Sequence, residues 1–281
     1  VITNIGTSHI EFLGSREGIC KAKLEILEGL QEGGAAVLCG DEPLLWDKRE
    51  SLGCRVVTYG IENSACDLTA DLHSDGTFDI VNNGLAAAHL PVGEKFTAKL
   101  SIPGKHNVLN ALAAEAVGLL LGETPELIAQ GLVSYQASGM RQNIYEQDGY
   151  QIYADCYNAS PDAMEATLSV LGGMAGEGRR FAVLGSMLEL GDYAEEGHRR
   201  AGRAAAQYAD ALYAYGPDAA AMVAGAREKG MEHAYAFDDQ TALVGALRED
   251  AKKGDALLFK GSRGMRMERA LAMFLGEEVE A

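Results

Sequence analysis

Short apolar runs rich in β-branched and aromatic residues alternate with stretches of helical periodicity along most of this chain. The runs at 1–5, 35–39 and 55–59 are separated by helical patterns at 17–30 and 42–51. Strands that alternate with helices in this way are typical of parallel sheets covered by helices. The sequence therefore predicts an α/β protein.

The strand pattern changes between residues 67 and 102. Ser-Asp-Gly at 74–76 and Asn-Asn-Gly at 82–84 separate short runs there, and such triplets are turn signals between antiparallel strands. A helix is expected over 107–121, where apolar residues recur every three or four positions, and Thr124-Pro125 predicts the start of another. The first half is thus expected to hold a mixed sheet with helices.

A second pattern begins after a small, polar stretch near 137–142. A hairpin is expected around Asp148-Gly149, and strands then alternate strictly with Ala-rich helices. The predicted strands are 181–184, 211–215, 233–237 and 256–259. This order predicts a doubly wound, Rossmann-like domain, and we place the domain boundary between 137 and 138.

Composition and charge argue against several kinds of binding partner. The 281 residues carry 24 Lys and Arg against 41 Asp and Glu, for a formal charge of −17, and the cations form no stripe. Nucleic acid and anionic membranes are therefore poor partners. No apolar run approaches the ~20 residues that span a bilayer, so we expect no membrane insertion and a cytoplasmic protein. The five cysteines form no C-x-x-C pair, and we expect free thiols and no structural zinc.

The sequence contains neither G-x-G-x-x-G nor G-x-x-x-x-G-K-[ST], the two common nucleotide-binding motifs. Its richest constellation lies near the N-terminus, where a predicted strand leads to His9 and a helix carries Lys21 and Lys23. A histidine at the carboxyl end of a strand is placed to meet a metal or a phosphate. Equally open is a surface histidine followed by two exposed lysines.

The segment 3–26, TNIGTSHIEFLGSREGICKAKLEI, resembles the ATP-dependent Mur ligases, and further motifs of that family follow in order. They are GKHNVLNALAA at 104–114, Arg141, DCYNASP at 155–161, LGSMLELG at 184–191 with His198, and KGSRG at 260–264. The family usually has Asp at the position of Ser186. Its uridine-nucleotide domain and phosphate-binding loop precede the matching region. We therefore expect a fragment with the later part of the central ATP-binding domain over 1–137 and the C-terminal domain over 138–281.

The resemblance implies an enzyme that forms an amide bond at the expense of ATP through an acyl phosphate, in peptidoglycan precursor synthesis. The implied cofactors are ATP and Mg²⁺. The implied partners are UDP-N-acetylmuramoyl-tripeptide and D-Ala-D-Ala, and we expect a monomer. Because the phosphate-binding loop is missing, we expect the fragment itself to be inactive. The alternatives are a sister ligase, either a tripeptide-forming one or a folylpolyglutamate synthetase, and a non-catalytic binding module.

The resemblance also implies roles for particular residues. Lys23, fourteen residues after His9, would be carbamylated, and both would be catalytic residues that hold the metal. The family's acidic third ligand would lie before Val1. The implied ATP-binding residues are Asn107, Arg141, Asp155 and Asn158, and the implied peptide-binding residues are Lys260, Ser262 and Arg263.

The residues by themselves leave plainer roles open. Asn107 fits a helix cap as well as a contact to a base edge. Arg141 fits an exposed linker charge, and Asp155 fits the start of a helix. Glu189 and His198 fit packing or capping groups as well as functional ones.

Overall fold

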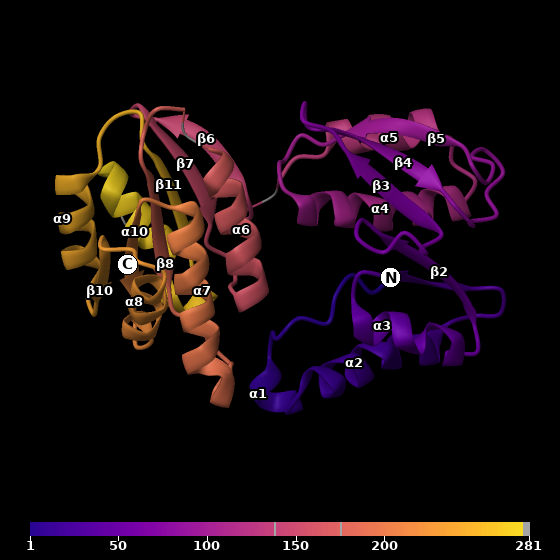
Figure 1. Ribbon diagram of the computed structural model, residues 1–281, viewed down its shortest axis with the longest axis horizontal. Helices are drawn as coiled ribbons and strands as arrows, with labels where there is room; N and C mark the ends of the chain where they lie inside the picture. Colours follow the sequence, from indigo (N-terminus) through magenta and orange to yellow (C-terminus); the bar gives the residue numbers. More distant parts are fainter. Residues whose placement is uncertain (138, 175, 278–281) are drawn as a thin grey trace. The chain divides into compact units, whose positions relative to one another are not determined.

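The computed structural model describes residues 1–137, 139–174 and 176–277, and its contacts divide the chain into two compact units (Figure 1). Unit 1 comprises Val1–Gly6 and Leu13–Gln136, and unit 2 comprises Thr7–Phe12 and Ala137–Ala281. The short segment Thr7–Phe12, with most of α1 (Ile10–Leu13), thus packs with the C-terminal half of the chain. The predicted boundary touches Ser138, which lies outside the described residues, and it stays a prediction.

Unit 1 contains a mixed sheet in the order β1-β2-β3-β4-β5, as the sequence predicts. The first three strands are parallel, and β4 and β5 continue the sheet antiparallel. The strands are β1 (Ala35–Cys39), β2 (Arg55–Gly60), β3 (Leu68–Leu72), β4 (Thr77–Asn82) and β5 (Lys95–Lys99).

The strand predicted over 1–5 is wrong. Among the described residues this segment pairs with β1 through an isolated bridge between Ile2 and Leu38. Beyond Ile2 the backbone has side-chain partners instead, because the Asn4 carbonyl accepts from Lys23 and the Ile5 N–H donates to Glu42. A ladder cannot continue where its donors and acceptors are already in use.

The helices of unit 1 largely follow the predicted segments. Gly104 precedes α4 with a φ of +115°, and the Thr124 hydroxyl caps α5 by accepting from the Leu127 N–H. The predicted segment 17–30 divides into a helix and a 3₁₀ turn, and so does 42–51. The elements are α2 (Arg16–Leu24), η1 (Glu25–Gly29), α3 (Pro43–Lys48), η2 (Arg49–Ser51), α4 (Lys105–Leu120) and α5 (Pro125–Ser134).

Unit 2 contains a second sheet in the order β10-β9-β8-β11-β7-β6 within the described residues. Its strands are parallel except for the edge strand β6, which forms a hairpin with β7. The strands are β6 (Asn143–Gln147), β7 (Tyr150–Asp155), β8 (Arg180–Gly185), β9 (Ala211–Tyr215), β10 (Ala234–Phe237) and β11 (Ala256–Lys260). The chain leaves β8 toward β9 on one side and returns at β11 on the other. This reversal is the topological switch point of a doubly wound sheet, which confirms the predicted fold.

Helices cover both faces of this sheet (Figure 1). α7 packs against α6 and α8, while α9 packs against α10. The core between sheet and helices contains Phe181, Val183, Leu257 and Phe259, all fully buried. The helical elements are α6 (Pro161–Gly173), η3 (Gly191–Tyr193), α7 (Ala194–Tyr208), α8 (Ala219–Glu228), α9 (Gln240–Asp250), η4 (Arg263–Met265) and α10 (Met267–Leu275).

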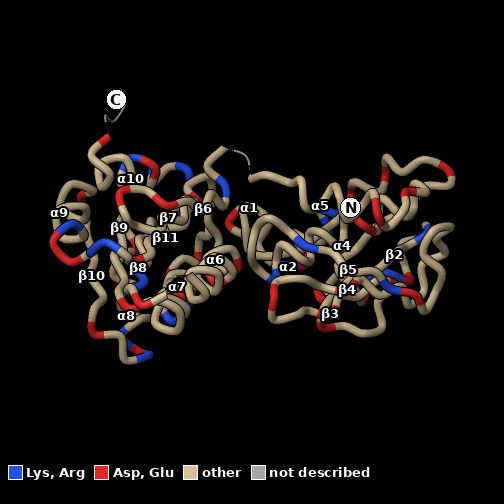
Figure 2. Tube along the Cα trace, turned by 90° about the horizontal axis from the view of Figure 1, so that it is seen from above, with Lys and Arg blue, Asp and Glu red and all other residues tan. Residues whose placement is uncertain are grey.

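Charges of both signs are interspersed over each unit (Figure 2). In unit 2, Arg199 and Arg203 of α7 pair with Glu228 at the end of α8, so these cations are already neutralised by carboxylates. Within the described part of the chain, no helix has the length and apolar character needed to cross a membrane.

The core of unit 1 contains a carboxyl group that is costly to bury, that of Glu115 on α4. The side chain is fully buried, and neither of its oxygens has a hydrogen-bond partner among the described residues. Burial raises the pKa of Glu115 to about 8, since an ionised carboxylate loses its hydration there. The folded protein therefore holds a proton at neutral pH that the unfolded chain releases.

We expect Glu115→Leu to stabilise the protein at pH 8 far more than at pH 5. Between its ordinary pKa and the raised one, the wild-type free energy of unfolding falls by about 1.4 kcal/mol per pH unit. Leu removes that loss, so the gain should be roughly 3 to 4 kcal/mol larger at pH 8 than at pH 5. Urea denaturation at both pH values measures it, with the exposed Glu123→Gln as control. A gain that is equal at the two pH values would contradict the buried proton.

Candidate functional site

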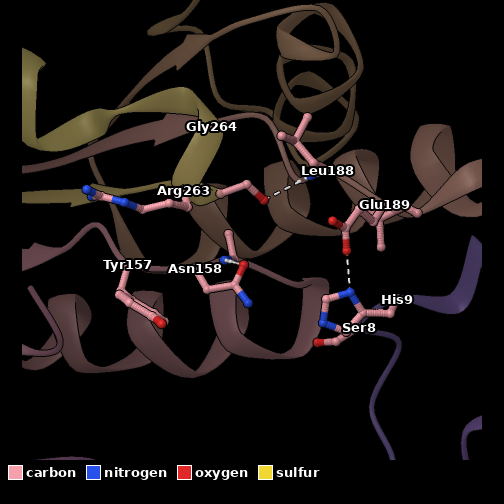
Figure 3. Close-up of a pocket in the computed structure, with 11 residues that line it drawn as sticks. Ser8, His9, Tyr157, Asn158, Leu188, Glu189, Arg263 and Gly264 are labelled. Atoms are coloured by element: carbon pink, nitrogen blue, oxygen red, sulfur yellow. Dashed lines mark hydrogen bonds and ion pairs between the residues drawn. The ribbon is translucent and has the colours of Figure 1, made fainter.

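The candidate site is a pocket of about 370 Å³ in unit 2, at the switch point of the sheet (Figure 3). β7, β8 and β11 end side by side, and the segment after each one contributes to the wall. These segments provide Tyr157 and Asn158, Leu188 and Glu189, and Ser262 and Arg263, and the segment Thr7–Phe12 adds Ser8 and His9. Ligands of open α/β sheets bind outside the carboxyl ends of the strands at this point. We call this cavity the switch-point pocket.

His9 lies at the pocket with its ring nitrogen Nδ1 against the carboxylate of Glu189 (Figure 3). Both residues have left-handed backbone, with φ of +61° and +64°. Such angles are uncommon outside glycine and tend to occur at functional sites. The His9 side chain is 59% exposed, so the carboxylate orients an imidazole that a ligand can reach.

Asp155 and Lys260 form a buried ion pair behind the pocket, joining the ends of β7 and β11. The Lys260 ammonium lies 2.5 Å from Asp155 Oδ2 and also donates to the Asn158 carbonyl at 2.9 Å. Asp155 Oδ1 accepts from the Gln142 N–H at 3.3 Å. Lys260 is 2% exposed and Asp155 is 8% exposed. Two residues that the resemblance assigns to different ligands are thus brought together, and they hold the turn that carries Asn158.

Removing one member of this pair should destabilise the protein, because it leaves the other charge buried without a counter-ion. We expect Lys260→Met to lower the free energy of unfolding by about 3 to 5 kcal/mol. The double variant with Asp155→Leu should recover a large part of that loss, since no charge then remains in the core. Urea denaturation of the wild type, the single and the double variants provides the test. Equal stability of wild type and Lys260→Met would show that the pair is not a structural element.

Three more predicted residues lie at or beside the switch-point pocket. The Arg141 guanidinium stacks on the Tyr157 ring at 4.0 Å, so it is held in place rather than free in a linker. Arg263 pairs with Glu268 at 2.8 Å and keeps 58% of its side chain exposed. Ser262 is 4% exposed, and its hydroxyl accepts from the Leu188 N–H at 2.9 Å. Arg263 is therefore accessible at the pocket, and Arg141 is held beside it by the Tyr157 ring.

Asn107 belongs to unit 1 and is 4% exposed in the first turn of α4. Gly104 occupies the N-cap position, and the Asn107 amide instead donates to the Pro103 carbonyl at 2.6 Å. With Asn110 it lines a largely apolar cavity of about 400 Å³, to which Leu132 and Tyr135 also contribute. An apolar cavity with a few amide groups is suited to a planar heterocycle.

Lys23 also belongs to unit 1, near the end of α2. Its ammonium donates to the Asn4 carbonyl at 2.8 Å and to Asn4 Oδ1 at 3.3 Å. Partial removal from water lowers the pKa of Lys23 below its usual value, since burial disfavours the charged form. His9 and Lys23 belong to different units. No three His, Cys, Asp or Glu side chains in the described ranges are grouped as a metal cage would require.

The sequence does not reveal the partners of several site residues. Glu189 contacts His9 across 180 positions, and Lys260 contacts Asp155 across 105. Tyr157 lies within a motif, yet nothing in the sequence assigns it to Arg141. The signal that was available is positional, because Tyr157, Glu189 and Lys260 each follow a predicted strand at its carboxyl end.

The fold and the pocket define a two-unit α/β protein with a candidate ligand site at the carboxyl ends of parallel strands. Residues 1–118 match the family model of the Mur ligase middle domain, and residues 140–263 match that of the Mur ligase glutamate ligase domain. The chain belongs to the Mur ligase family, which confirms the resemblance found in the sequence.

Relatives and solved structures show which members of the family this chain resembles. The UDP-N-acetylmuramoyl-tripeptide--D-alanyl-D-alanine ligase of Bacillus subtilis (strain 168) is 39% identical over 272 residues, which are 95% of this chain and 57% of that relative. A crystal structure of MurF from Acinetobacter baumannii matches with a TM-score of 0.83 at 28% identity, over 98% of this chain and 59% of that one. MurF ligase from Thermotoga maritima in complex with ADP matches with a TM-score of 0.80 at 29% identity, over 98% and 62%. The chain therefore spans about three fifths of these proteins' length.

Proposed function

We propose that this chain acts in an ATP-dependent ligase that joins D-Ala-D-Ala to UDP-N-acetylmuramoyl-tripeptide, in the cytoplasm, during peptidoglycan precursor synthesis. The observation that carries the proposal is the switch-point pocket, where three family motifs meet through Asn158, Glu189 and Arg263. The names of the relatives support the same substrates. They favour this activity over that of a sister ligase.

The proposed reaction has two steps. The terminal carboxylate of the tripeptide attacks the γ-phosphorus of ATP, and ADP leaves as an acyl phosphate forms. The amine of D-Ala-D-Ala then attacks the acyl carbon, loses a proton, and expels phosphate. Both steps depend on positioning and on neutralising negative charge. Arg263 at the pocket and Arg141 on Tyr157 are the guanidinium groups that we assign to this neutralisation.

The remaining proposed contacts follow from the two cavities. We assign the base of ATP to the apolar cavity of unit 1, where the amides of Asn107 and Asn110 are suited to the donor and acceptor edge of adenine. The ADP complex of the Thermotoga maritima MurF ligase supports a nucleotide ligand. Asn158 and Ser262 remain proposed ligand contacts, whereas we propose that Asp155 and Lys260 act by holding the pocket's turn.

Mg²⁺ is the second cofactor that we propose, with His9 and Lys23 as ligands. As an ammonium that donates to Asn4, Lys23 does not fit a cation that takes oxygen ligands. Carbamylation resolves the misfit, because a neutral amine that adds carbon dioxide and releases a proton to solvent becomes an anionic oxygen donor. The lowered pKa of Lys23 favours the neutral amine that this addition requires. A bound Mg²⁺ would neutralise phosphate charge during transfer.

Phosphate release tests the proposed activity. The complete product of the gene that encodes this chain should release phosphate from ATP when both UDP-N-acetylmuramoyl-tripeptide and D-Ala-D-Ala are present. Omitting D-Ala-D-Ala should abolish continuous release. The 281-residue chain assayed by itself should show no turnover, since its sequence holds no G-x-x-x-x-G-K-[ST] loop to cradle phosphates. Binding of both substrates without any phosphate release by the complete product would favour a binding module instead.

Carbamylation of Lys23 can be tested without any assay of activity. In protein equilibrated with ¹³C-bicarbonate, we expect a carbamate carbon signal by NMR that disappears in Lys23→Ala. The matched control is Lys21→Ala, two positions along the same helix, which should retain the signal because its side chain points to another face. A spectrum that is identical in wild type and Lys23→Ala would remove Lys23 from the proposed metal site.

A further inference from the structure

One wall of the switch-point pocket is formed by the loop that follows β8, from Ser186 to Leu190. Side chains from distant elements hold its first backbone amides. The Met187 N–H donates to His198 Nε2 at 2.8 Å, and the Leu188 N–H donates to Ser262 Oγ at 2.9 Å. Ser186 donates its own N–H to the Tyr215 carbonyl at 2.9 Å. The loop therefore enters the pocket along a fixed path.

His198 is an unusual member of this set because it is a fully buried imidazole on α7. Its Nδ1 lies 2.6 Å from the carbonyl oxygen of Ala194, and a carbonyl oxygen can accept but not donate. Nδ1 must then carry the proton. Nε2 faces the Met187 N–H, which can donate but not accept, so Nε2 must be the unprotonated acceptor. The two partners together select one neutral tautomer.

Other groups near the ring fit this assignment. Asp218 Oδ2 lies 3.7 Å from Nε2, beyond hydrogen-bond distance, and its side chain is 30% exposed. The Asp218 N–H donates to Ser186 Oγ at 3.0 Å, which keeps the start of α8 next to the loop. The ring thus bridges α7 and the Met187 amide through two hydrogen bonds, which fix the distance between them.

The residues that follow Met187 are the ones that contact the pocket. Leu188 and Glu189 line it, and Glu189 contacts His9 from a left-handed backbone conformation (Figure 3). A left-handed residue relaxes unless its neighbours fix it. The acceptor at His198 fixes the amide two residues before Glu189, and Ser262 fixes the amide one residue before it.

We propose that His198 is a positioning residue: as a neutral imidazole protonated on Nδ1, it holds the Met187 amide and so sets the Leu188–Glu189 wall and the orientation of His9. Its effect on catalysis rests on the proposed ligase function. Its effect on the loop does not, and the two are tested separately.

The loop is tested by NMR on the 281-residue chain with ¹⁵N-labelled histidine. We expect Nδ1 of His198 to show the shift of a protonated nitrogen and Nε2 that of an unprotonated one. His198→Leu should move the His9 ring signals, since the wall loses its anchor. His198→Gln keeps an acceptor near the Nε2 position, and it should leave the His9 signals close to those of the wild type. A proton on Nε2, or His9 signals that are unchanged in His198→Leu, would overturn the proposal.

The catalytic effect is tested in the complete gene product by phosphate release that depends on D-Ala-D-Ala. We expect His198→Leu to lower kcat/KM about tenfold, the lower end of the loss seen when a partner that orients a functional side chain is removed, and His198→Gln to restore most of it. Leu243→Ala, on the buried face of α9, serves as a control that lowers stability and leaves kcat/KM unchanged. If Leu243→Ala lowered kcat/KM as much as His198→Leu does, the effect of His198 would be one of fold stability and not of positioning. Absence of release by the wild type would overturn the proposed function, and the NMR result would still decide the role of His198 in the loop.

Discussion

The buried pair of Asp155 and Lys260 is the interaction on which the site depends. Parallel strands β7 and β11 end next to each other, and without a bond between their ends the following loops could diverge. A lysine and an aspartate that exclude water between those ends tie the loops at a defined separation. The cost of burying both charges is offset because each has further partners, the Asn158 carbonyl for the ammonium and the Gln142 backbone N–H for the carboxylate.

The loops that line the pocket are held by this pair and by further buried side chains. The Asn158 turn is fixed by Lys260, and the loop after β8 is fixed by His198 and Ser262. The buried polar groups have hydrogen-bond partners within the protein, and the exposed polar groups of the pocket remain available to a ligand. The side chains of His9 and Arg263 are more than half exposed, whereas Lys260, His198 and Ser262, which hold the pocket's loops in place, are buried. Such a layered arrangement allows a site to be rigid and accessible together.

Glu115 shows the opposite case, a buried polar group without compensation in the described structure. It lies on the α4 face that packs into unit 1, among residues such as Ala111 and Leu119. The helical periodicity of α4 places residue 115 on the buried, apolar face of the helix. The carboxyl group can occupy that position only as the neutral acid. The stability of unit 1 is therefore coupled to pH through one side chain that lines neither cavity.

The sequence by itself determined the order of strands and helices, the mixed and doubly wound sheets, and the family, because periodicity, turn residues and short motifs are local properties. It failed at residues 1–5, whose apolar character resembles a strand although Lys23 and Glu42 take part of the backbone's hydrogen bonds. The family resemblance assigned Asp155 to ATP and Lys260 to the peptide, and these ligand contacts stay predictions. Tertiary structure decided that these two bind each other, that Glu189 orients His9, and that Tyr157 carries Arg141. Asp155 and Lys260 lie far apart in the chain and meet because parallel strands bring their carboxyl ends to one edge of the sheet, whereas Glu189 and Tyr157 reach their partners from the loops after β8 and β7.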